Sequence, residues 1–519
     1  VLGLDHTLRR WMTLTEEHNA MNTPAPISTR VRFAFAVLLL ALSFTAGGSD
    51  QVCAAGQWLS GDFHHHTWLT DGNHTQQAIA GNAFNRYQLD WIASSEHGGT
   101  SKNDSDGHAF PSPVWRWITL TYYSYPIIED LRRDYPGKLL IQGLEWNVPG
   151  HEHASVGIIA DQPRAISNFE YRFDRQDTDV SRANEGLPKQ NATHNDALAA
   201  LKWLQENHPG ACYVVINHPS RKLRYSAADL RDFNNAAPDA AVGFEGLPGH
   251  QSADSRGRYR AGPFMDQNGT DITGKARTYG GADYMLATVG GLWDALLGEG
   301  RRFWVFANSD FHRTGESFWP GEYSKSYVFA SERSLSSLVD GLRSGNSFAV
   351  HGDLIKALDF RASGGSSQAT MGEVLTVKKG QPVVLSIKYQ SPAVNNHGDT
   401  VEVDHIDLIA GEVKGRAAPG TPGYREDTNE TAAVIERFTT KGQKPDTDGW
   451  ISVEFKLNKA EKDMYFRLRG TNLGLGVENE TDPQGDPLLD DLMGTNGPDK
   501  AYKDLWFYSN PIFLSVNQE

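Results

Sequence analysis

Two histidines separated by one residue, His64 and His66, open the segment of the sequence with the clearest chemical potential. On an extended strand, side chains two residues apart point to the same side, so these imidazoles can bind one metal ion while His65 faces elsewhere. Asp71 follows on the next turn. Taken alone, the segment is equally compatible with a hydrogen-bonded polar strand end.

Comparable groups of histidine and carboxylate recur further along the chain. They are Ser95-Glu96-His97, Gly143-Leu144-Glu145, Gly150-His151-Glu152-His153, Asn217-His218-Pro219 and Ser309-Asp310-Phe311-His312. Neutral imidazole and carboxylate are the ligands that borderline and hard divalent metals prefer. Several buried carboxylates are costly unless cations neutralise them. The repetition therefore predicts a metal centre assembled from distant segments.

Short apolar runs precede most of these groups and predict buried strands. The runs are Trp58–Phe63, Leu89–Ser94, Leu139–Gln142, Ser155–Ile159, Tyr213–Asn217, Val242–Phe244 and Trp304–Asn308. Helical patterns lie between several of them, most clearly at Asn195–Asn207, which Thr193 or Asn195 can cap, and at Gly291–Leu297. Alternating strands and helices predict a parallel sheet, and seven such units suit a closed or nearly closed barrel. The C-terminal strand ends of a barrel converge on one face, which would gather the polar groups.

The pattern changes after about residue 350. Apolar residues then alternate with polar ones, as in Ile451, Val453, Phe455 and Leu457, and again in Val383–Tyr389 and Met464–Leu468. This period of two predicts an antiparallel β domain, most simply a sandwich, and Ala362–Ala369 reads as a loop near the junction. We therefore expect an N-terminal extension over 1–55, a barrel over 56–352 and a β-sandwich over 353–519.

The ordered series of motifs resembles the PHP (polymerase and histidinol phosphatase) superfamily over about Gln57–Gly352. The residues that flank these motifs make the chain similar to the carbaryl-hydrolase (CehA/McbA-like) branch. They are Gly143-Leu144-Glu145-Trp146, Pro149-Gly150-His151, Asn217-His218-Pro219, Gly249-His250-Gln251 and Gly291-Leu292-Trp293-Asp294. The resemblance implies an α/β fold with a distorted (β/α)7 barrel of the PHP type. It also implies two or three divalent metal ions, with zinc, manganese and iron all compatible with the ligands.

The resemblance also assigns ligands. A first ion would be held by His64, His66, Glu145 and Asp310, and a third by Asp71, His97 and His312. Glu145 would bridge to a second ion, completed by His218 and by one of His151 and His153, of which the Gly-His pattern favours His151. One departure is Ser95-Glu96-His97, where many relatives have Thr-Asp-His, and the role of Glu96 stays open.

Hydrolysis is the activity that such a centre implies. Metal ions that share a water lower its pKa, so the bridging hydroxide would be the nucleophile, and no Gly-x-Ser-x-Gly nucleophile elbow is present. Arg221 and Lys222 can hold a phosphate oxygen or protonate a leaving group, and His250 can do likewise; a solvated loop is the alternative for the first two. We expect a phosphoesterase acting on a phosphodiester or phosphomonoester. A carbamate or carboxyl ester hydrolase and an inactive metal-binding scaffold are the alternatives.

The net charge and the N-terminal segment limit the kinds of partner and the cell compartment that we expect. Lys and Arg total 49 against 64 Asp and Glu, a net charge of −15, which argues against a nucleic-acid polymer but allows a small anionic ester. Arg30 and Arg32 precede an uncharged run over 33–46, and Cys53-Ala54-Ala55 suits signal-peptidase cleavage. We expect an exported protein, periplasmic or secreted, without stable membrane insertion after cleavage; an N-terminal core helix is the alternative. Cys212 is then a small buried hydrophobe.

Overall fold

The computed structural model describes residues 56–160, 162–179, 191–259, 262–490 and 497–517. The expected signal peptide lies outside the described residues. Ala54–Glu519 forms one compact unit, to which all of the described residues belong. No helix within the described ranges is long and apolar enough to cross a membrane.

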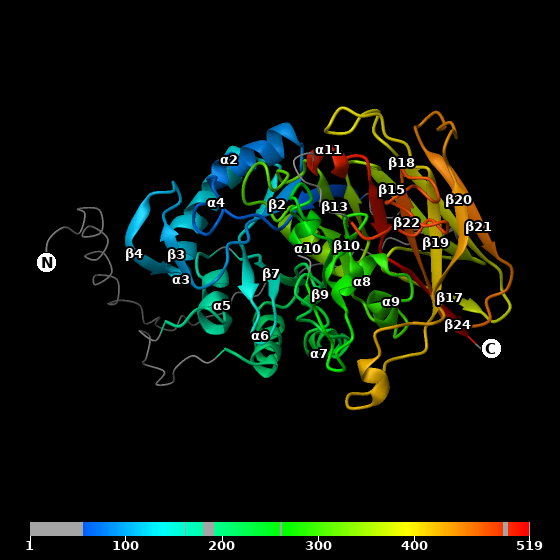
Figure 1. Cartoon of the computed structure of the whole chain (residues 1–519), viewed down its shortest axis with the longest axis horizontal. Coiled ribbons are helices and arrows are strands. Elements are labelled where there is room, and N and C mark those ends of the chain that lie inside the picture. Colours follow the sequence, from blue (N-terminus) through cyan, green and yellow to red (C-terminus); the bar gives the residue numbers. More distant parts are fainter. Residues whose placement is uncertain (1–55, 161, 180–190, 260–261, 491–496, 518–519) are drawn as a thin grey trace, which may run out of the picture. The chain divides into compact units, whose positions relative to one another are not determined.

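The first three predicted strands form one parallel part of a large mixed sheet (Figure 1). β1 (Gln57–Asp62) pairs in parallel with β2 (Trp91–Ala93), and β2 pairs in parallel with β5 (Leu139–Ile141). On its other edge β1 pairs antiparallel with β13 (Ser324–Ala330), which in turn pairs antiparallel with β14 (Ser347–His351). β2 and β5 are apolar and buried throughout, as expected of strands covered from both sides.

The remaining predicted strands join β6, which the sequence did not predict, in a second, five-stranded sheet in the order β12-β9-β8-β7-β6. Its members are β6 (Gly143–Asn147), β7 (His153–Ile158), β8 (Cys212–Ile216), β9 (Ala241–Leu247) and β12 (Trp304–Ala307). β8, β9 and β12 are parallel, whereas β7 runs antiparallel to both of its neighbours. The strand pairing therefore gives two sheets, linked at their ends by the isolated bridges His97↔Glu145 and His65↔Phe311.

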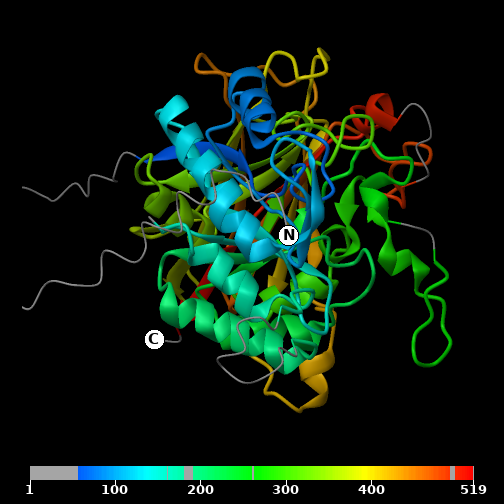
Figure 2. The ribbon, with the colours of Figure 1, turned by 90° about the vertical axis from the view of Figure 1, so that its left-hand side faces the viewer.

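The helices lie between the strands along the chain, and those from α2 to α6 occupy the side that faces the viewer in Figure 2. The helices are α2 (Gln76–Gly81), α3 (Arg116–Thr119), α4 (Tyr125–Asp134), α5 (Ala165–Phe173), α6 (His194–Asn207), α7 (Ala227–Ala236), α8 (Tyr284–Ala287), α9 (Leu292–Leu297), α10 (Leu335–Ser344) and α11 (Gly497–Ala501). Shorter helical turns are η1 (Asn82–Arg86), η2 (Leu120–Ser124), η4 (Arg256–Arg258), η5 (Thr273–Ala276) and η6 (Pro422–Arg425). Two short hairpins are β3 (Thr100–Asn103) with β4 (Ala109–Trp115), and β10 (Thr278–Tyr279) with β11 (Ala282–Asp283).

Two of the inter-strand helices, α6 and α7, begin with reciprocal caps. Thr193 accepts a hydrogen bond from the backbone of Asp196 at the start of α6, and the Asp196 carboxylate bonds back to Thr193. Ser226 and Asp229 make the same capping box at the start of α7. Each cap satisfies backbone donors that a helix start otherwise leaves unpaired, and so fixes where the helix begins.

The C-terminal residues build two sets of strands. β15 (Ala357–Gly364), β16 (Ser367–Thr370), β18 (Val383–Gln390) and β21 (Ile451–Leu457) form a four-stranded antiparallel sheet. β17 (Val374–Lys378), β19 (His405–Glu412), β20 (Ala433–Thr439), β22 (Met464–Thr471), β23 (Trp506–Ser509) and β24 (Ile512–Asn517) extend the large sheet that contains β1. The hydrogen-bonded sheet therefore continues across the expected boundary at 352–353, through the pairing of β14 with β23.

One prediction in this region is wrong. Residues 362–369 form the end of β15 and the start of β16 rather than a loop. Gly364 pairs with Ser367, so a two-residue turn connects the strands, and Gly365 adopts a φ of 60° that favours glycine. Small residues there serve a tight hairpin turn instead of a flexible connection.

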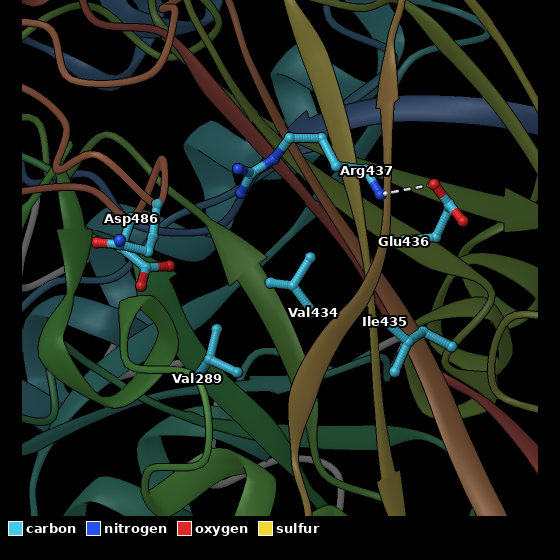
Figure 3. Close-up of a pocket in the computed structure, with 7 residues that line it drawn as sticks. Val289, Val434, Ile435, Glu436, Arg437 and Asp486 are labelled. Atoms are coloured by element: carbon cyan, nitrogen blue, oxygen red, sulfur yellow. Dashed lines mark hydrogen bonds between the residues drawn. The ribbon is translucent and has the colours of Figure 1, made fainter.

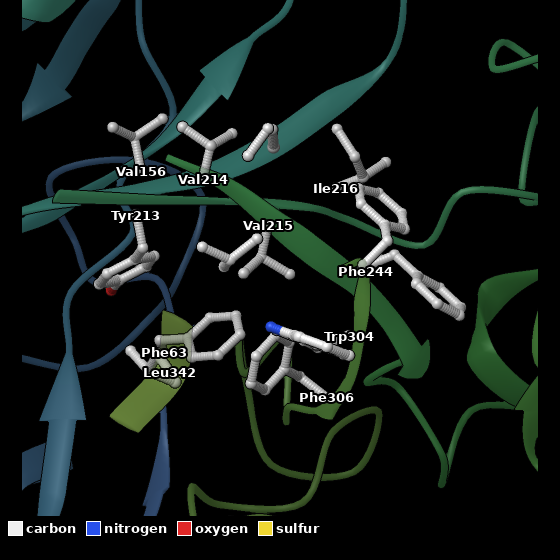
Figure 4. Close-up of a cluster of buried hydrophobic side chains, with 14 of the residues drawn as sticks. Phe63, Val156, Tyr213, Val214, Val215, Ile216, Phe244, Trp304, Phe306 and Leu342 are labelled. Carbon is white, nitrogen blue, oxygen red and sulfur yellow. The ribbon is translucent and has the colours of Figure 1, made fainter. Parts of the chain in front are cut away.

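The core of the second sheet sets the direction of the residues that follow β1. Phe63 packs against Trp91, Tyr213 and Phe306, with ring centroids 5.9, 5.6 and 5.5 Å away. Figure 4 shows Phe63 with Tyr213 and Phe306. All four rings are fully buried or nearly so. Because Phe63 is anchored in this apolar cluster, the next residue, His64, points away from it toward the polar ends of the strands.

Candidate metal centre

The predicted ligands lie where the strands of the two sheets end. His64 and His66 follow β1, Glu145 lies within β6, His153 begins β7, His218 follows β8, and Asp310 and His312 follow β12. The buried carboxylate of Asp62 joins two of these segments. It accepts hydrogen bonds from the backbone nitrogens of His64 (2.8 Å) and Ser309 (2.7 Å).

Glu145 is the centre of this group, and its carboxylate lies near the ring nitrogens of five histidines. The distances are 2.8 Å to Nδ1 of His97, 3.1 Å to Nδ1 of His153, 3.2 Å to Nε2 of His64, 3.3 Å to Nε2 of His218 and 3.4 Å to Nε2 of His66. Glu145 is 1% exposed, as is His218, and His64 and His66 are fully buried. One buried carboxylate surrounded in this way suits a ligand that is shared between ions.

Asp310 forms a second meeting point. Its Oδ1 lies 3.2 Å from Nε2 of His64 and 3.4 Å from Nε2 of His66, the two histidines that also face Glu145. Its Oδ2 lies 3.0 Å from Arg221 and 3.0 Å from His250. The two oxygens of Asp310 therefore connect the histidines to the cationic side of the site.

Asp71 gathers the third set of predicted ligands. Its carboxylate lies 3.2 Å from Nε2 of His312, 3.7 Å from Nε2 of His97 and 3.7 Å from Nδ1 of His66. The side chain of Asp71 is 54% exposed, in contrast to Glu145. This set marks the side of the site that is open to solvent.

The ring nitrogens of the site fit a metal centre better than a hydrogen-bonded network. Nε2 of His64, Nε2 of His66 and Nδ1 of His97 are buried and make no hydrogen bond, although each lies within 3.4 Å of a carboxylate oxygen of Glu145. The donor atoms of His66, Asp71, His97 and His312 lie within 4.8 Å of one another, as do those of His64, His66 and Asp310 and those of His97, Glu145 and His153. A buried unpaired nitrogen is costly, and divalent ions between these atoms would satisfy it.

The histidines of the site differ in protonation. Burial alone would lower the pKa of His64 and His97, but the neighbouring carboxylates reverse this, holding the pKa of His64 well above its usual range and raising that of His97 to about 9. Burial lowers the pKa of His66 to about 3, and the neighbouring His312 adds to the effect. Burial holds the pKa of His218 well below its usual range, and Arg221 adds to this. Burial alone would raise the pKa of Glu145, but His153, His97 and His64 reverse this and hold it well below its usual range. His66 and His218 are therefore neutral beside an ionised carboxylate, which are the forms that bind divalent ions, whereas His64 and His97 must release a proton when an ion binds.

The preference for His151 over His153 needs correction. His153 pairs with Asn147 at the start of β7, which puts it diagonally opposite Glu145 on the neighbouring strand. His151 lies in the preceding turn, where Gly150 has a φ of 79°, and its ring meets His194 instead. The two histidines are not on one extended segment, so only His153 reaches Glu145.

The structure separates the three residues that were expected to assist the chemistry. Arg221 donates to Asp310 and packs over the ring of Tyr259. His250 is 1% exposed, bonds to Ser317 through Nδ1 at 3.0 Å, and has a pKa that burial lowers to about 3. Lys222 instead pairs with Glu152 at 2.5 Å and is more than half exposed, so its ammonium group is held away from Asp310.

Two carboxylates near the site have supporting contacts. Glu96, whose role the sequence left open, accepts hydrogen bonds from the hydroxyls of Thr67 and Thr70 and so fixes the loop that follows His66. Glu245 lies 2.5 Å from Nδ1 of His64 and accepts from Asn308 at 3.0 Å and from the backbone of His218 at 2.9 Å. Glu245 received no function from the sequence, and the available signal is its position directly after the predicted strand Val242–Phe244.

A separate hollow of about 530 Å³ lies against strand β20 (Figure 3). Val289, Val434, Ile435, Glu436, Arg437, Gln484 and Asp486 line it. The guanidinium of Arg437 is bound to Asp407 at 2.6 and 2.9 Å. This hollow contains none of the predicted site residues.

No protein-family model and no curated protein matches the chain. Among solved structures, the chain is similar to a two-domain protein of Bacteroides vulgatus that contains a predicted PHP-like metal-dependent phosphoesterase. The two share 15% sequence identity with a TM-score of 0.35, over 84% of this chain and 94% of that one.

Proposed function

We propose that this chain is a metal-dependent hydrolase and that its substrate is a phosphoester. The observation that carries the proposal is the carboxylate of Glu145, buried within 3.4 Å of the ring nitrogens of five histidines. When bound, divalent ions would supply an activated water and stabilise the negative charge that develops on the attacked group. The residues of the chain hold the ions, orient the substrate and determine which face of the site is open.

The ligands divide into overlapping sets around Glu145. His64, His66 and Asp310 would hold one ion with Glu145; His153 and His218 would complete a second; and Asp71, His97 and His312 would hold a third. Zinc, manganese and iron each suit imidazole with carboxylate. The buried nitrogens that make no hydrogen bond support an occupied centre in the working protein.

Arg221 supports a phosphoester among the possible substrates. Its Nη2 donates to Asp310 at 3.0 Å, whereas its buried Nε has no hydrogen-bond partner. A guanidinium fixed at one end by a metal-site carboxylate, with a donor left over, can bind a phosphate oxygen. An uncharged carbamate would make less use of this cation.

The exposure of the side chains indicates the direction from which substrate would approach the site. Asp71 is 54% exposed and His97 25% exposed at the side-chain level, while His64 on the far side of Glu145 is fully buried. Substrate would therefore enter past Asp71 and His97. The inner histidines would remain shielded from bulk water.

The same proposal extends to the fold and the cell compartment. The parallel strands β1, β2 and β5, the second sheet and the two isolated bridges between them support a distorted barrel of the PHP type. The apolar cluster shared by β15, β18, β19 and β22 supports a sandwich over the C-terminal residues. We also propose export, on the strength of the sequence before residue 56 alone.

The test is hydrolysis of a bis-aryl phosphodiester, an aryl phosphomonoester and an aryl carbamate by the purified protein, before and after chelation. The proposal expects turnover of a phosphoester that chelation abolishes and added metal restores. Turnover of the carbamate alone would replace the phosphoesterase with a carbamate hydrolase. No turnover of any ester after reloading with zinc, manganese or iron would favour a metal-binding scaffold.

A further inference from the structure

His151, which does not reach Glu145, belongs to a second cluster of metal-binding side chains. It lies in the turn between β6 and β7 and meets His194, the first residue of α6. Asp229 and Asp232 come from α7, which packs beside α6 (Figure 1). Three segments of the chain thus meet at one point.

Three donor atoms converge there. Nε2 of His151 lies 2.9 Å from Nδ1 of His194, and Nδ1 of His194 lies 3.5 Å from Oδ1 of Asp229. One ligand atom from each of the three residues lies within 4.8 Å of the other two. His151 is 6% exposed, whereas the side chains of His194 and Asp229 are 28% and 25% exposed, so an ion can enter from solvent.

The other polar atom of each side chain is already occupied. Nδ1 of His151 bonds to the carbonyl oxygen of Arg224 at 2.8 Å, and Nε2 of His194 bonds to Oδ2 of Asp232 at 3.2 Å. Oδ2 of Asp229 accepts the hydroxyl of Ser226 at 2.6 Å in the cap of α7. Each side chain therefore has one atom held in place and one atom directed at the common point.

These contacts fix which ring nitrogens carry hydrogen. A carbonyl only accepts, so Nδ1 of His151 donates and its Nε2 presents a lone pair. A carboxylate likewise accepts from Nε2 of His194, which leaves a lone pair on Nδ1. In the neutral rings, two lone pairs then face each other at 2.9 Å beside the carboxylate of Asp229. A cation bound to all three relieves this repulsion.

We propose that His151, His194 and Asp229 bind one divalent cation, with zinc the best match, at a site separate from the centre around Glu145. Two imidazoles and a carboxylate are a common zinc ligand set. Metal-bound histidines usually donate their second N–H to a carboxylate or a backbone carbonyl, as His151 and His194 do here. The proposal does not depend on the hydrolase activity.

The position of the site gives the ion a structural role. It ties the turn that leads into β7 to the starts of α6 and α7. His151, its ligand in that turn, lies two residues before His153. Gly150 packs closely on α6, since a Cβ there would lie 2.9 Å from the backbone nitrogen of His194. Tyr424, from the C-terminal part of the chain, donates to Asp232 at 2.7 Å and supports the same point. The ion would therefore help to hold His153 against Glu145.

The test compares zinc binding by the wild type with His194→Gln, Asp232→Asn and His208→Gln. His208, at the end of α6, is the matched control, because its substitution removes a histidine from the same helix outside the cluster. Each protein is stripped with chelator, reloaded with zinc, measured by elemental analysis and titrated calorimetrically, with circular dichroism as the check of folding. We expect His194→Gln to hold one ion per chain fewer than the wild type and His208→Gln. Asp232→Asn should bind that ion about 10- to 100-fold more weakly.

Equal metal content and equal affinities in folded His194→Gln and wild type would overturn the proposal. The short distance between His151 and His194 would then be explained by a proton shared between the two rings. If His194→Gln does not fold, an unchanged affinity in Asp232→Asn overturns it instead. Glu145→Gln separates the two centres, because this variant should keep the ion that His194→Gln loses. The outcome is thus independent of whether the protein hydrolyses an ester.

Discussion

The carboxylate of Glu245 lies 2.5 Å from Nδ1 of His64, while Nε2 of the same ring faces Glu145 and Asp310 at 3.2 Å each. Because a carboxylate only accepts, Glu245 holds the hydrogen of His64 on Nδ1 and directs the lone pair of Nε2 into the metal centre. Glu245 thereby orients a ligand without being one.

Replacing Glu245 with Gln should weaken metal binding without removing a ligand. We expect the affinity for the tightest-bound ion to fall about 10- to 100-fold, the range typical of partners that orient metal ligands. Calorimetric titration of the chelated protein measures it, and the exposed carboxylate of Glu454 offers a matched substitution to Gln. Wild-type affinity in a folded Glu245→Gln protein would show that His64 needs no such partner.

Arg221 and its sequence neighbour Lys222 should differ in their effect on turnover. Arg221→Gln removes the cation bound to Asp310, and we expect kcat/KM for a phosphoester to fall about 10- to 100-fold, or roughly 1.4 to 2.7 kcal/mol of transition-state stabilisation. Lys222→Gln removes a cation paired to Glu152 and should stay near the wild type. Steady-state kinetics of both variants decide the matter, and equal losses would contradict the role given to Arg221.

A buried ion pair joins helix α9 to strand β22, which lies in the C-terminal part of the chain. Asp294 on α9 receives Arg467 of β22 through two hydrogen bonds of 2.8 and 2.7 Å, and both residues are almost fully buried. Asp294→Asn leaves the guanidinium without its counter-charge, and we expect the free energy of unfolding to drop by about 3 to 5 kcal/mol. Denaturant unfolding measures this. Asp359→Asn, at a half-exposed pair with Arg361, should cost about 1 kcal/mol or less.

The pH dependence of stability should carry a contribution from Asp174. Burial raises the pKa of Asp174 to about 6, against the hydrogen bonds from Asn147 that lower it. The folded protein therefore binds a proton that the unfolded chain releases near its ordinary pKa of about 4. The contribution is favourable below about pH 4 and is lost as the pH rises through about 6. Unfolding of Asp174→Asn should lack this decline, and parallel pH profiles for the variant and the wild type would argue against a raised pKa.

Much of the strand pattern was predictable from the sequence because it depends on local periodicity. All seven predicted strands of the N-terminal region are present with shifted ends, and so are the predicted strands at Val383, Ile451 and Met464. The prediction that His65 faces away from the ligands is confirmed, since its ring bonds to Gln76. Of the two caps that the sequence allowed for α6, Thr193 and Asn195, the structure has Thr193.

Other features depend on contacts between residues far apart in the chain, which periodicity does not contain. Alternation predicted strands after residue 350 but not that β23 would pair with β14, more than 150 residues earlier. His151 and His153 have the same spacing as His64 and His66. However, Gly150 has a positive φ and turns the chain just before β7, so the two histidines do not share one extended strand. The second cluster, with His194 and Asp229, arises only once α6 and α7 pack together.

The most direct test of the metal centre is elemental analysis of the wild type and Glu145→Gln, together with phosphoester turnover by the same samples. Glu145→Gln keeps the shape of the side chain but removes the charge shared by five histidines. We predict at least two ions per chain in the wild type, fewer in a folded variant, and turnover reduced by about 1,000-fold or more. Full metal content and full turnover in Glu145→Gln would contradict a hydrolytic metal centre around this carboxylate.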